Sequence, residues 1–184
     1  EDTMARSYWL IKSEPYKYAW DELVKDKWTY WDGVRNYEAR NNLSAMKLHD
    51  LCLYYHSTVG KEVVGVARVR RESYPDPTPD DERGVVVDVE PVVPLARPVT
   101  LADIKAEKVL AEMNLIRRSR LSVVPVARLE FDRVLSMGRT KLPRAAAAKK
   151  PAKKAAKKAS KAKAAAPAKT WLFDPRRGVL RLIP

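Results

Sequence analysis

The chain has 184 residues, a length typical of about one domain, and a formal net charge of +13 at pH 7. Its single cysteine, Cys52, excludes an internal disulfide, and no apolar run approaches the roughly 20 residues of a membrane helix. We therefore expect an intracellular protein without membrane association, located in the cytoplasm or nucleoid if bacterial and in the nucleus if eukaryotic.

The first half of the chain alternates short strands with short helices. Residues 8–12, 50–56 and 62–71 are rich in aromatic and branched side chains and are predicted strands. Helices are predicted over residues 21–27, where acids precede lysines, and over 37–46. Gly65, inside the third strand, indicates a bulge or a close approach of another segment to the backbone.

The second half continues this alternation. Residues 73–83 are predicted to be a proline-rich loop, and residues 84–93 a strand that Pro94 and Pro98 end. Thr100 is a predicted helix cap with Asp103 completing the capping box, and helices are predicted over 101–107, 109–113 and 127–137. This mixture of strands and short helices indicates an α+β architecture over residues 4–138.

The basic charge is concentrated after this domain. Residues 139–184 hold 15 of the 36 lysines and arginines and one acid, whereas residues 1–138 hold 21 basic and 22 acidic residues. Because 145–169 consist almost entirely of Ala, Lys and Pro, we predict a disordered Lys/Ala/Pro-rich basic tail over 139–169. The short apolar segment 170–184 could dock on the domain, bind a partner or lack structure, and its role stays open.

The most informative stretch is residues 31–42, Trp-Asp-Gly-Val-Arg-Asn-Tyr-Glu-Ala-Arg-Asn-Asn. Aromatic planes beside amide edges suit the binding of a planar, hydrogen-bonding ring such as a nucleobase. For Trp31 we favour a pocket wall over a core position, and Tyr37 stays open between the two. Trp9, Trp20 and Trp28 are predicted core residues because each lies beside a patterned element.

Three motifs in this order resemble the EVE domain family: residues 9–15 (Trp-Leu-Ile-Lys-Ser-Glu-Pro), 31–37, and 120–126 (Arg-Leu-Ser-Val-Val-Pro-Val). The resemblance runs from about residue 8 to 137. It implies a PUA-like mixed β-barrel with short surrounding helices, related to the YTH domains that read methylated adenine in RNA. It also implies binding of a modified base, with the family association being 5-methylcytosine and related modified cytosines in DNA.

The same resemblance implies that parts of these motifs, together with residues 55–57, line the ligand cavity. The predicted ligand-binding residues are Ser13, Glu14, Pro15, Trp31, Gly33, Val34, Arg35, Asn36, Tyr37, Tyr55, His56, Ser57, Arg120, Leu121 and Ser122. For His56 a hydrogen-bonded structural role is the favoured alternative. The predicted contacts to the nucleic-acid backbone are Arg117, Arg118, Lys149, Lys150, Lys153, Lys154, Lys157 and Lys158.

The sequence contains no catalytic signature. Nucleophile-elbow, phosphate-loop and dinucleotide motifs do not occur, and Cys52 with His49 and His56 is too small a set for a metal site. We expect Cys52 to be a small buried hydrophobic residue. We therefore predict a non-catalytic, monomeric DNA-binding module that uses neither metal nor cofactor. Two alternatives remain: an RNA-binding accessory of RNA modification or processing, and an enzyme or binder for a small nucleotide-like ligand, with Glu14 or His56 as acid or base.

Deleting residues 139–184 is expected to flatten the salt dependence of nucleic-acid affinity and leave base preference intact. The reason is that 12 lysines and arginines between residues 139 and 169 would contact phosphates without reading bases. Titration of modified and unmodified oligonucleotides at several salt concentrations measures both quantities. A base preference that disappears with the tail would contradict this division of labour.

Overall fold

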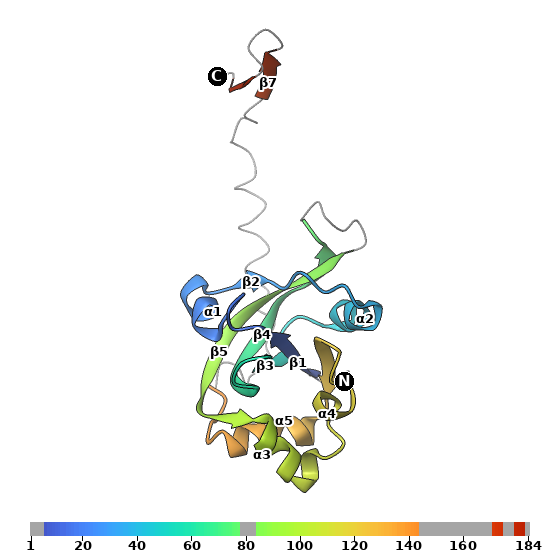
Figure 1. Ribbon diagram of the computed structural model, residues 1–184, viewed down its shortest axis with the longest axis vertical. Helices are drawn as coiled ribbons and strands as arrows, with labels where there is room; N and C mark the ends of the chain where they lie inside the picture. The colour runs from blue at the N-terminus through green and yellow to red at the C-terminus, as the bar shows by residue number, and fades with distance from the viewer. Residues whose placement is uncertain (1–5, 78–83, 144–170, 175–178, 183–184) are drawn as a thin grey trace, which may run out of the picture. The chain divides into compact units, whose positions relative to one another are not determined.

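The computed structural model describes residues 6–77, 84–143, 171–174 and 179–182. The chain divides into two compact units, Glu1–Ala147 and Ala148–Pro184. The first contains a six-stranded sheet with short helices around it (Figure 1). Within the second, β7 (Trp171–Asp174) and β8 (Val179–Leu182) form an antiparallel hairpin. The predicted tail of residues 139–169 lies outside the described residues from residue 144 onward.

The sheet is mixed and has the strand order β2-β5-β4-β3-β1-β6. Its strands are β1 (Tyr8–Ser13), β2 (Thr29–Tyr30), β3 (Leu51–His56), β4 (Glu62–Pro75), β5 (Val85–Thr100) and β6 (Val123–Val126). Only β1 and β3 pair in parallel, with Ser13 opposite His56. The carboxyl ends of these two strands therefore lie side by side, and the chain segments that follow them meet at one edge of the sheet.

The helices are short and lie on several sides of the sheet. They are α1 (Trp20–Asp26), α2 (Tyr37–Ala45), α3 (Leu101–Ala106), the 3₁₀ turn η1 (Lys108–Leu110), α4 (Asn114–Arg117) and α5 (Arg128–Met137). In Figure 1, α1 and α2 flank the upper half of the domain, and α3, α4 and α5 lie along its lower end. The helices predicted over 21–27, 37–46, 101–107 and 127–137 are confirmed, whereas residues 109–113 form no α-helix.

The start of α3 follows the capping box predicted from the sequence. The Thr100 hydroxyl accepts a hydrogen bond from the Asp103 N–H at 3.1 Å, and the Asp103 carboxylate accepts one from the Thr100 N–H at 3.2 Å. Two otherwise unsatisfied amides at the helix start are thereby paired.

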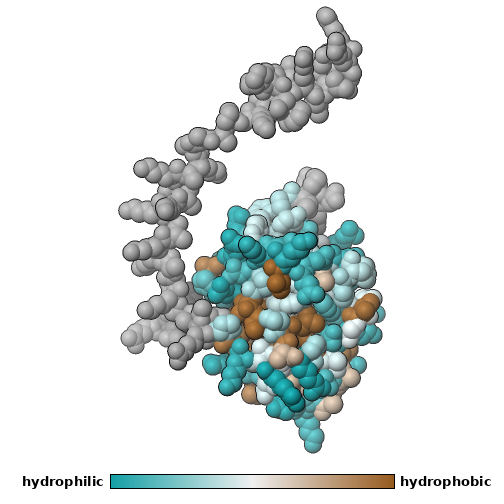
Figure 2. All heavy atoms as spheres, turned by 90° about the vertical axis from the view of Figure 1, so that its left-hand side faces the viewer, coloured by the Kyte–Doolittle hydropathy of each residue, from teal (hydrophilic) through white to brown (hydrophobic). Residues whose placement is uncertain are grey.

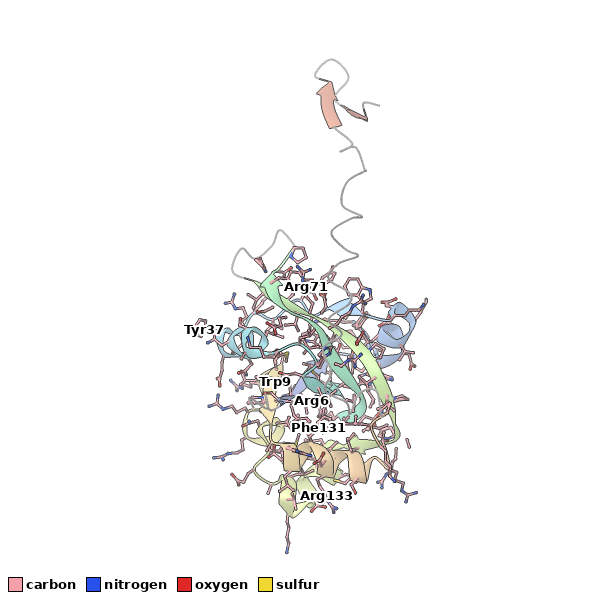
Figure 3. The ribbon with its side chains drawn as sticks, turned by 180° about the vertical axis from the view of Figure 1, so that it is seen from behind. Arg6, Trp9, Tyr37, Arg71, Phe131 and Arg133 are labelled. Carbon is pink, nitrogen blue, oxygen red and sulfur yellow. The ribbon has the colours of Figure 1, made fainter. Side chains whose placement is uncertain are left out.

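The core lies between the sheet and the helices. Leu10, Ile11 and Leu53 are fully buried on β1 and β3. From α5, Phe131 points at the sheet (Figure 3) and packs against Tyr8, with ring centroids 4.6 Å apart. The C-terminal helix of the domain is therefore part of the same core as the first strand.

Two predicted strand boundaries are wrong. β5 continues to Thr100, beyond the predicted end at Val93, because Pro91 and Pro94 pair with β4 next to register shifts, where a missing N–H costs little. β4 continues to Pro75, so the predicted loop over 73–83 begins too early. β2 and β6 were not predicted, since two and four residues give too short a pattern.

The predicted closed barrel is also corrected. Among the described residues the two outer strands, β2 and β6, are not hydrogen-bonded to each other, so the sheet stays open. Helix α2 packs against both β5 and β6 and covers part of this opening. What the structure supports is a mixed α/β fold with a six-stranded sheet and short helices.

Figure 2 shows the side of the domain that carries α1, where apolar side chains gather in the middle and hydrophilic ones surround them. Contrary to the prediction, Trp28 is not in the core: its side chain is 42% exposed and stacks with Arg70. Trp9 and Trp20 are buried as predicted. Within the described part of the chain, no helix has both the length and the apolar character required to cross a bilayer.

Gly65 marks a close contact between α1 and β4. A Cβ atom placed on Gly65 would lie 2.5 Å from the Trp20 ring, and the β4–β5 register shifts between Val63 and Gly65. Both parts of the prediction for this glycine, a bulge and a close approach, are therefore confirmed. Only the absence of a side chain lets the indole lie directly on the strand.

Gly65→Ala is expected to destabilise the domain by about 1–3 kcal/mol, because the new methyl group overlaps a buried ring. Urea unfolding of the variant measures this change in free energy. Trp20→Phe provides the matched partner. The double variant Trp20→Phe/Gly65→Ala should lose less free energy of unfolding than the two single variants lose in sum. Strict additivity would show that the ring is not what Gly65 accommodates.

Candidate functional site

A cavity of about 670 Å³ lies where the segments after β1 and β3 meet β2 and the segment before β6. It is lined by Lys12, Ser13, Glu14, Lys17, Tyr18, Thr29, Tyr30, Trp31, Asp32, Gly33, Val34, Ser57, Ser119, Arg120, Leu121 and Ser122. Nine of the fifteen predicted ligand-binding residues are in this set: Ser13, Glu14, Trp31, Gly33, Val34, Ser57, Arg120, Leu121 and Ser122. The three separated motifs therefore do converge on one site.

Trp31 forms a rigid aromatic wall of the cavity. Its backbone N–H donates to the Val87 carbonyl at 2.8 Å, and only 7% of the residue is exposed. Its ring packs edge-on against buried Tyr54, with centroids 5.5 Å apart and an interplanar angle of 85°. The pocket and core interpretations of Trp31 therefore hold together: the ring is anchored in the core and also lines the cavity.

The chain leaves the cavity after Val34. Gly33 adopts a left-handed conformation, with φ +70°, and Val34 is buried beside it. Asn36 is then used as the N-cap of α2, where its Oδ1 accepts a hydrogen bond from the Ala39 N–H at 3.1 Å. Tyr37 is 74% exposed and points away from the domain (Figure 3). The structure does not bring Arg35, Asn36 or Tyr37 to the cavity.

The segment after β1 lines the cavity with polar groups that already have partners. The Ser13 hydroxyl donates to the Tyr18 carbonyl at 2.6 Å. The Glu14 carboxylate lies 2.5 Å from the Lys17 ammonium, and hydrogen bonding from Lys17 holds the pKa of Glu14 below its usual range. Pro15 is not among the lining residues. The Ser13 hydrogen bond and the Glu14–Lys17 ion pair therefore hold this part of the cavity wall.

At the end of β3, the predicted residues separate. Tyr55 is buried in the core, and only Ser57 lines the cavity. The His56 Nε2 accepts a hydrogen bond from the backbone N–H of Trp20 at 3.1 Å, which requires an unprotonated nitrogen. Burial accordingly lowers the pKa of His56 from its ordinary value of 6.5. His56 therefore has the structural role that was the favoured alternative.

The loop before β6 closes the cavity on the other side, and Lys12 holds it in place. The Lys12 Nζ donates to the Ser119 carbonyl at 2.8 Å, and the Lys12 backbone N–H donates to the Ser122 carbonyl at 2.9 Å. Burial lowers the pKa of Lys12. Arg120 is exposed and, among the described residues, has no acidic partner. The loop therefore presents an unpaired guanidinium at the cavity.

Two arginines at the end of α4 and directly after it are engaged with acids. Arg117 lies 2.7 Å from the Glu112 carboxylate, and Arg118 pairs with Glu38 of α2. Both pairs are exposed. The predicted backbone-binding lysines Lys149, Lys150, Lys153, Lys154, Lys157 and Lys158 lie outside the described residues.

Seven lining residues were missed by the sequence reasoning: Lys12, Lys17, Tyr18, Thr29, Tyr30, Asp32 and Ser119. Lys12, Asp32 and Ser119 lie inside or next to the quoted motifs and could have been found there. Lys17, Tyr18, Thr29 and Tyr30 carry no such signal, because a two-residue strand brings the last two to the cavity. Asp32 is exposed and has no hydrogen-bonding or ionic partner among the described residues.

Cys52 is fully buried, as predicted, and burial raises the pKa of its thiol. In the part of the chain that the structure describes, no three His, Cys, Asp or Glu side chains are grouped in a way that would hold a metal ion.

The His56 hydrogen bond predicts a pH-dependent stability. Because the folded-state pKa lies below the unfolded value of 6.5, the unfolded state binds the proton more readily. The stabilisation is therefore present above pH 6.5 and is lost as the pH falls below it. Urea unfolding between pH 7 and pH 5.5 should show a decline that His56→Gln, which keeps a hydrogen-bond acceptor, does not show. Equal declines in both proteins would contradict this assignment.

Known proteins are similar to this chain over the region that forms the cavity. The EVE domain model matches residues 7–137. Thymocyte nuclear protein 1 of Mus musculus is 37% identical over 169 residues, covering 73% of this chain and 75% of that protein. A solved structure from Rhodopseudomonas palustris is 47% identical, with a TM-score of 0.69 over 72% of this chain and 93% of that one. Human thymocyte nuclear protein 1, solved in complex with 5-methylcytosine-containing DNA, is 34% identical, with a TM-score of 0.66 over 73% of this chain and 99% of that one. The chain therefore belongs to the EVE domain family.

Proposed function

We propose that this domain binds DNA containing a 5-modified cytosine and holds the modified base, extruded from the duplex, in the cavity beside Trp31. The observation that carries the proposal is the aromatic wall formed by Trp31 within a cavity of about 670 Å³, a size typical of small-ligand sites. The relative solved with 5-methylcytosine-containing DNA supports the choice of base and nucleic acid.

Stacking would supply much of the base affinity. A base on an aromatic ring gains about 1–3 kcal/mol, and Trp31 needs no rearrangement because Tyr54 and the Val87 carbonyl already hold it. Extrusion costs a few kcal/mol, so a preformed wall lowers the total cost of binding.

The base edge would be read by Asp32. A carboxylate accepts a hydrogen bond from the exocyclic amino group of cytosine, and the Asp32 carboxylate has no partner among the described residues. Val34 and Leu121 supply apolar surface for a 5-substituent. One buried methyl group is worth about 0.8 kcal/mol, about fourfold in affinity, so preference by contact alone is modest.

The flanking phosphates would be bound by arginines at the end of α4 and in the loop before β6. Arg120 is positioned for this without giving up an ion pair. Arg117 and Arg118, predicted from the sequence as backbone contacts, would exchange Glu112 and Glu38 for phosphate. Exposed ion pairs of this kind are weak, at about 0–1 kcal/mol, so the exchange costs little. The basic tail over 139–169 would add affinity that does not depend on sequence.

We further propose that binding proceeds without chemical conversion. The two groups considered as acid or base are both engaged: Glu14 is paired with Lys17, and the His56 Nε2 accepts a hydrogen bond from Trp20. A general base needs a free position within hydrogen-bond reach of its substrate. These contacts disfavour Glu14 and His56 as acid or base, and the proposal gives the Asp32 carboxylate, which is unpartnered among the described residues, a role in recognition.

Trp31→Ala is expected to lower affinity for 5-methylcytosine DNA by about 5- to 150-fold, the equivalent of one lost stacking contact. Tyr37→Ala is the matched control, since it removes an aromatic ring of the same motif that is 74% exposed and outside the cavity. Fluorescence anisotropy with labelled duplexes measures both, and thermal unfolding establishes that each variant is folded. Asp32→Asn, at an exposed position, tests the cavity without disturbing the core.

The intact protein should be compared on matched DNA and RNA oligonucleotides with unmodified, 5-methylated and 5-hydroxymethylated cytosine and with N6-methyladenine. Tightest binding to a 5-modified cytosine in DNA, abolished by Trp31→Ala, is the expected result. A preference for RNA would support the RNA-binding alternative. Equal, weak binding to every oligonucleotide would overturn the proposed function.

A further inference from the structure

Strands β4 and β5 extend beyond the rest of the sheet. β3 pairs with β4 only as far as Arg68, whereas β4 continues to Pro75 and stays paired with β5. On the other edge of this part of β5 lies β2, where Tyr30 pairs with Asp88. In Figure 3, Arg71 lies near the projecting end of this extension. We call the extension and β2 together the arm.

One face of the arm collects arginine and aromatic side chains. Tyr30, Asp88 and Arg71 lie directly opposite one another on β2, β5 and β4, so their side chains share a face. The register between Val69 and Arg71 contains a bulge at Arg70. A bulge re-aims the side chain of the extra residue, and Arg70 reaches the ring of Trp28, next to β2.

The arginines of this face are stacked on rings. The Arg71 guanidinium carbon lies 3.9 Å from the centroid of Tyr74, and that of Arg70 lies 5.1 Å from the centroid of Trp28. Stacking restricts the movement of a guanidinium and leaves its N–H donors free, as phosphate recognition requires. Both arginines are exposed, as are Trp28, at 42%, and Tyr30, at 38%.

The nearby carboxylates are already engaged. Asp88 accepts a hydrogen bond from the Tyr74 hydroxyl at 2.6 Å, and Glu90 pairs with Arg68. Among the described residues, no acid lies within ion-pair distance of Arg70 or Arg71. This differs from Arg117 and Arg118, which each have an acidic partner. Within the described residues, the arm therefore presents two arginines that have no ion-pair partner.

The arm face begins at the cavity wall. Thr29 and Tyr30 of β2 both line the cavity, and Tyr30 lies opposite Asp88, which accepts the hydrogen bond from the Tyr74 hydroxyl. A strand whose nucleotide occupies the cavity would therefore pass directly onto this face. Arg120 lies on a different segment of the cavity rim, in the loop before β6.

We propose that the arm face, formed by Trp28, Tyr30, Arg70, Arg71 and Tyr74, binds the phosphodiester backbone of the nucleic-acid strand next to the extruded nucleotide. The proposal rests on the proposed function, because it takes the cavity as the place of the base. It assigns to Arg70 and Arg71 a contact that is independent of sequence and of modification.

The test is Arg70→Gln/Arg71→Gln in the full chain, since glutamine removes the positive charge and keeps part of the aliphatic stem. Affinity for duplexes with and without one 5-methylcytosine is measured over a range of salt concentrations. Both affinities should fall on the order of tenfold, and the slope of log K against log salt should become shallower by about 1 to 2. The ratio of the two affinities should stay unchanged.

Lys105→Ala/Arg128→Ala is the control, because it removes two exposed charges on α3 and α5, away from the cavity lining. The control should change the DNA affinity and the slope of log K against log salt less than the arm variant does. Thermal unfolding of both double variants establishes that the arm is folded. If the double arm variant does not fold, the single substitution Arg70→Gln is measured in its place.

Three results would overturn the proposal: an unchanged affinity and slope, a loss equal to that of the control, and a loss confined to the methylated duplex. The last would place the arginines at the base and not at the backbone. A parent protein with no preference for modified DNA, combined with a slope reduced by the arm variant, would instead contradict the proposed function and leave the arm as a backbone contact.

Discussion

The site depends on the packing of aromatic rings around Tyr54. This residue is fully buried at the centre of β3, and its ring meets Trp20 and Trp31 edge-on at centroid distances of 5.3 and 5.5 Å. Its hydroxyl donates to the Tyr18 carbonyl at 3.0 Å, which fixes the segment after β1. Gly65 allows Trp20 to lie on the sheet. The contacts of Tyr54 with Trp31 and Tyr18 therefore join two cavity-lining segments to the core.

A single motif serves two different structural purposes. Residues 31–34 line the cavity, whereas Asn36 begins α2 as its cap. Because α2 packs against β5 and β6, the motif also covers part of the opening between the two ends of the sheet. This explains why a segment that lines the cavity continues into an amide that does not face it. Lys12 likewise has two roles: it lines the cavity, and its ammonium donates a hydrogen bond to the Ser119 carbonyl in the loop before β6.

Much of the fold could be predicted from the sequence, since apolar periodicity and capping residues are local signals. α5, the Thr100 cap and the close approach at Gly65 are examples. The prediction failed where pairing between distant strands decides the outcome. Pro91 and Pro94 sit in β5 because register shifts accommodate them, and Thr29 and Tyr30 form a strand because β5 is beside them. For the site, the motifs located the cavity but did not predict which side chains face it. Tyr37 begins α2 and is exposed, and the His56 ring accepts a hydrogen bond from the backbone of Trp20.

The central claim is that the modified base leaves its duplex and lies against Trp31. It is tested most directly by NMR of the full chain bound to a short duplex that carries one 5-methylcytosine with a ¹³C-labelled methyl group. Nuclear Overhauser contacts from this methyl group to Trp31, Val34 or Leu121, with loss of its contacts to neighbouring bases, are the predicted result. A methyl group that keeps its contacts to the stacked bases and shows none to the cavity would contradict the account.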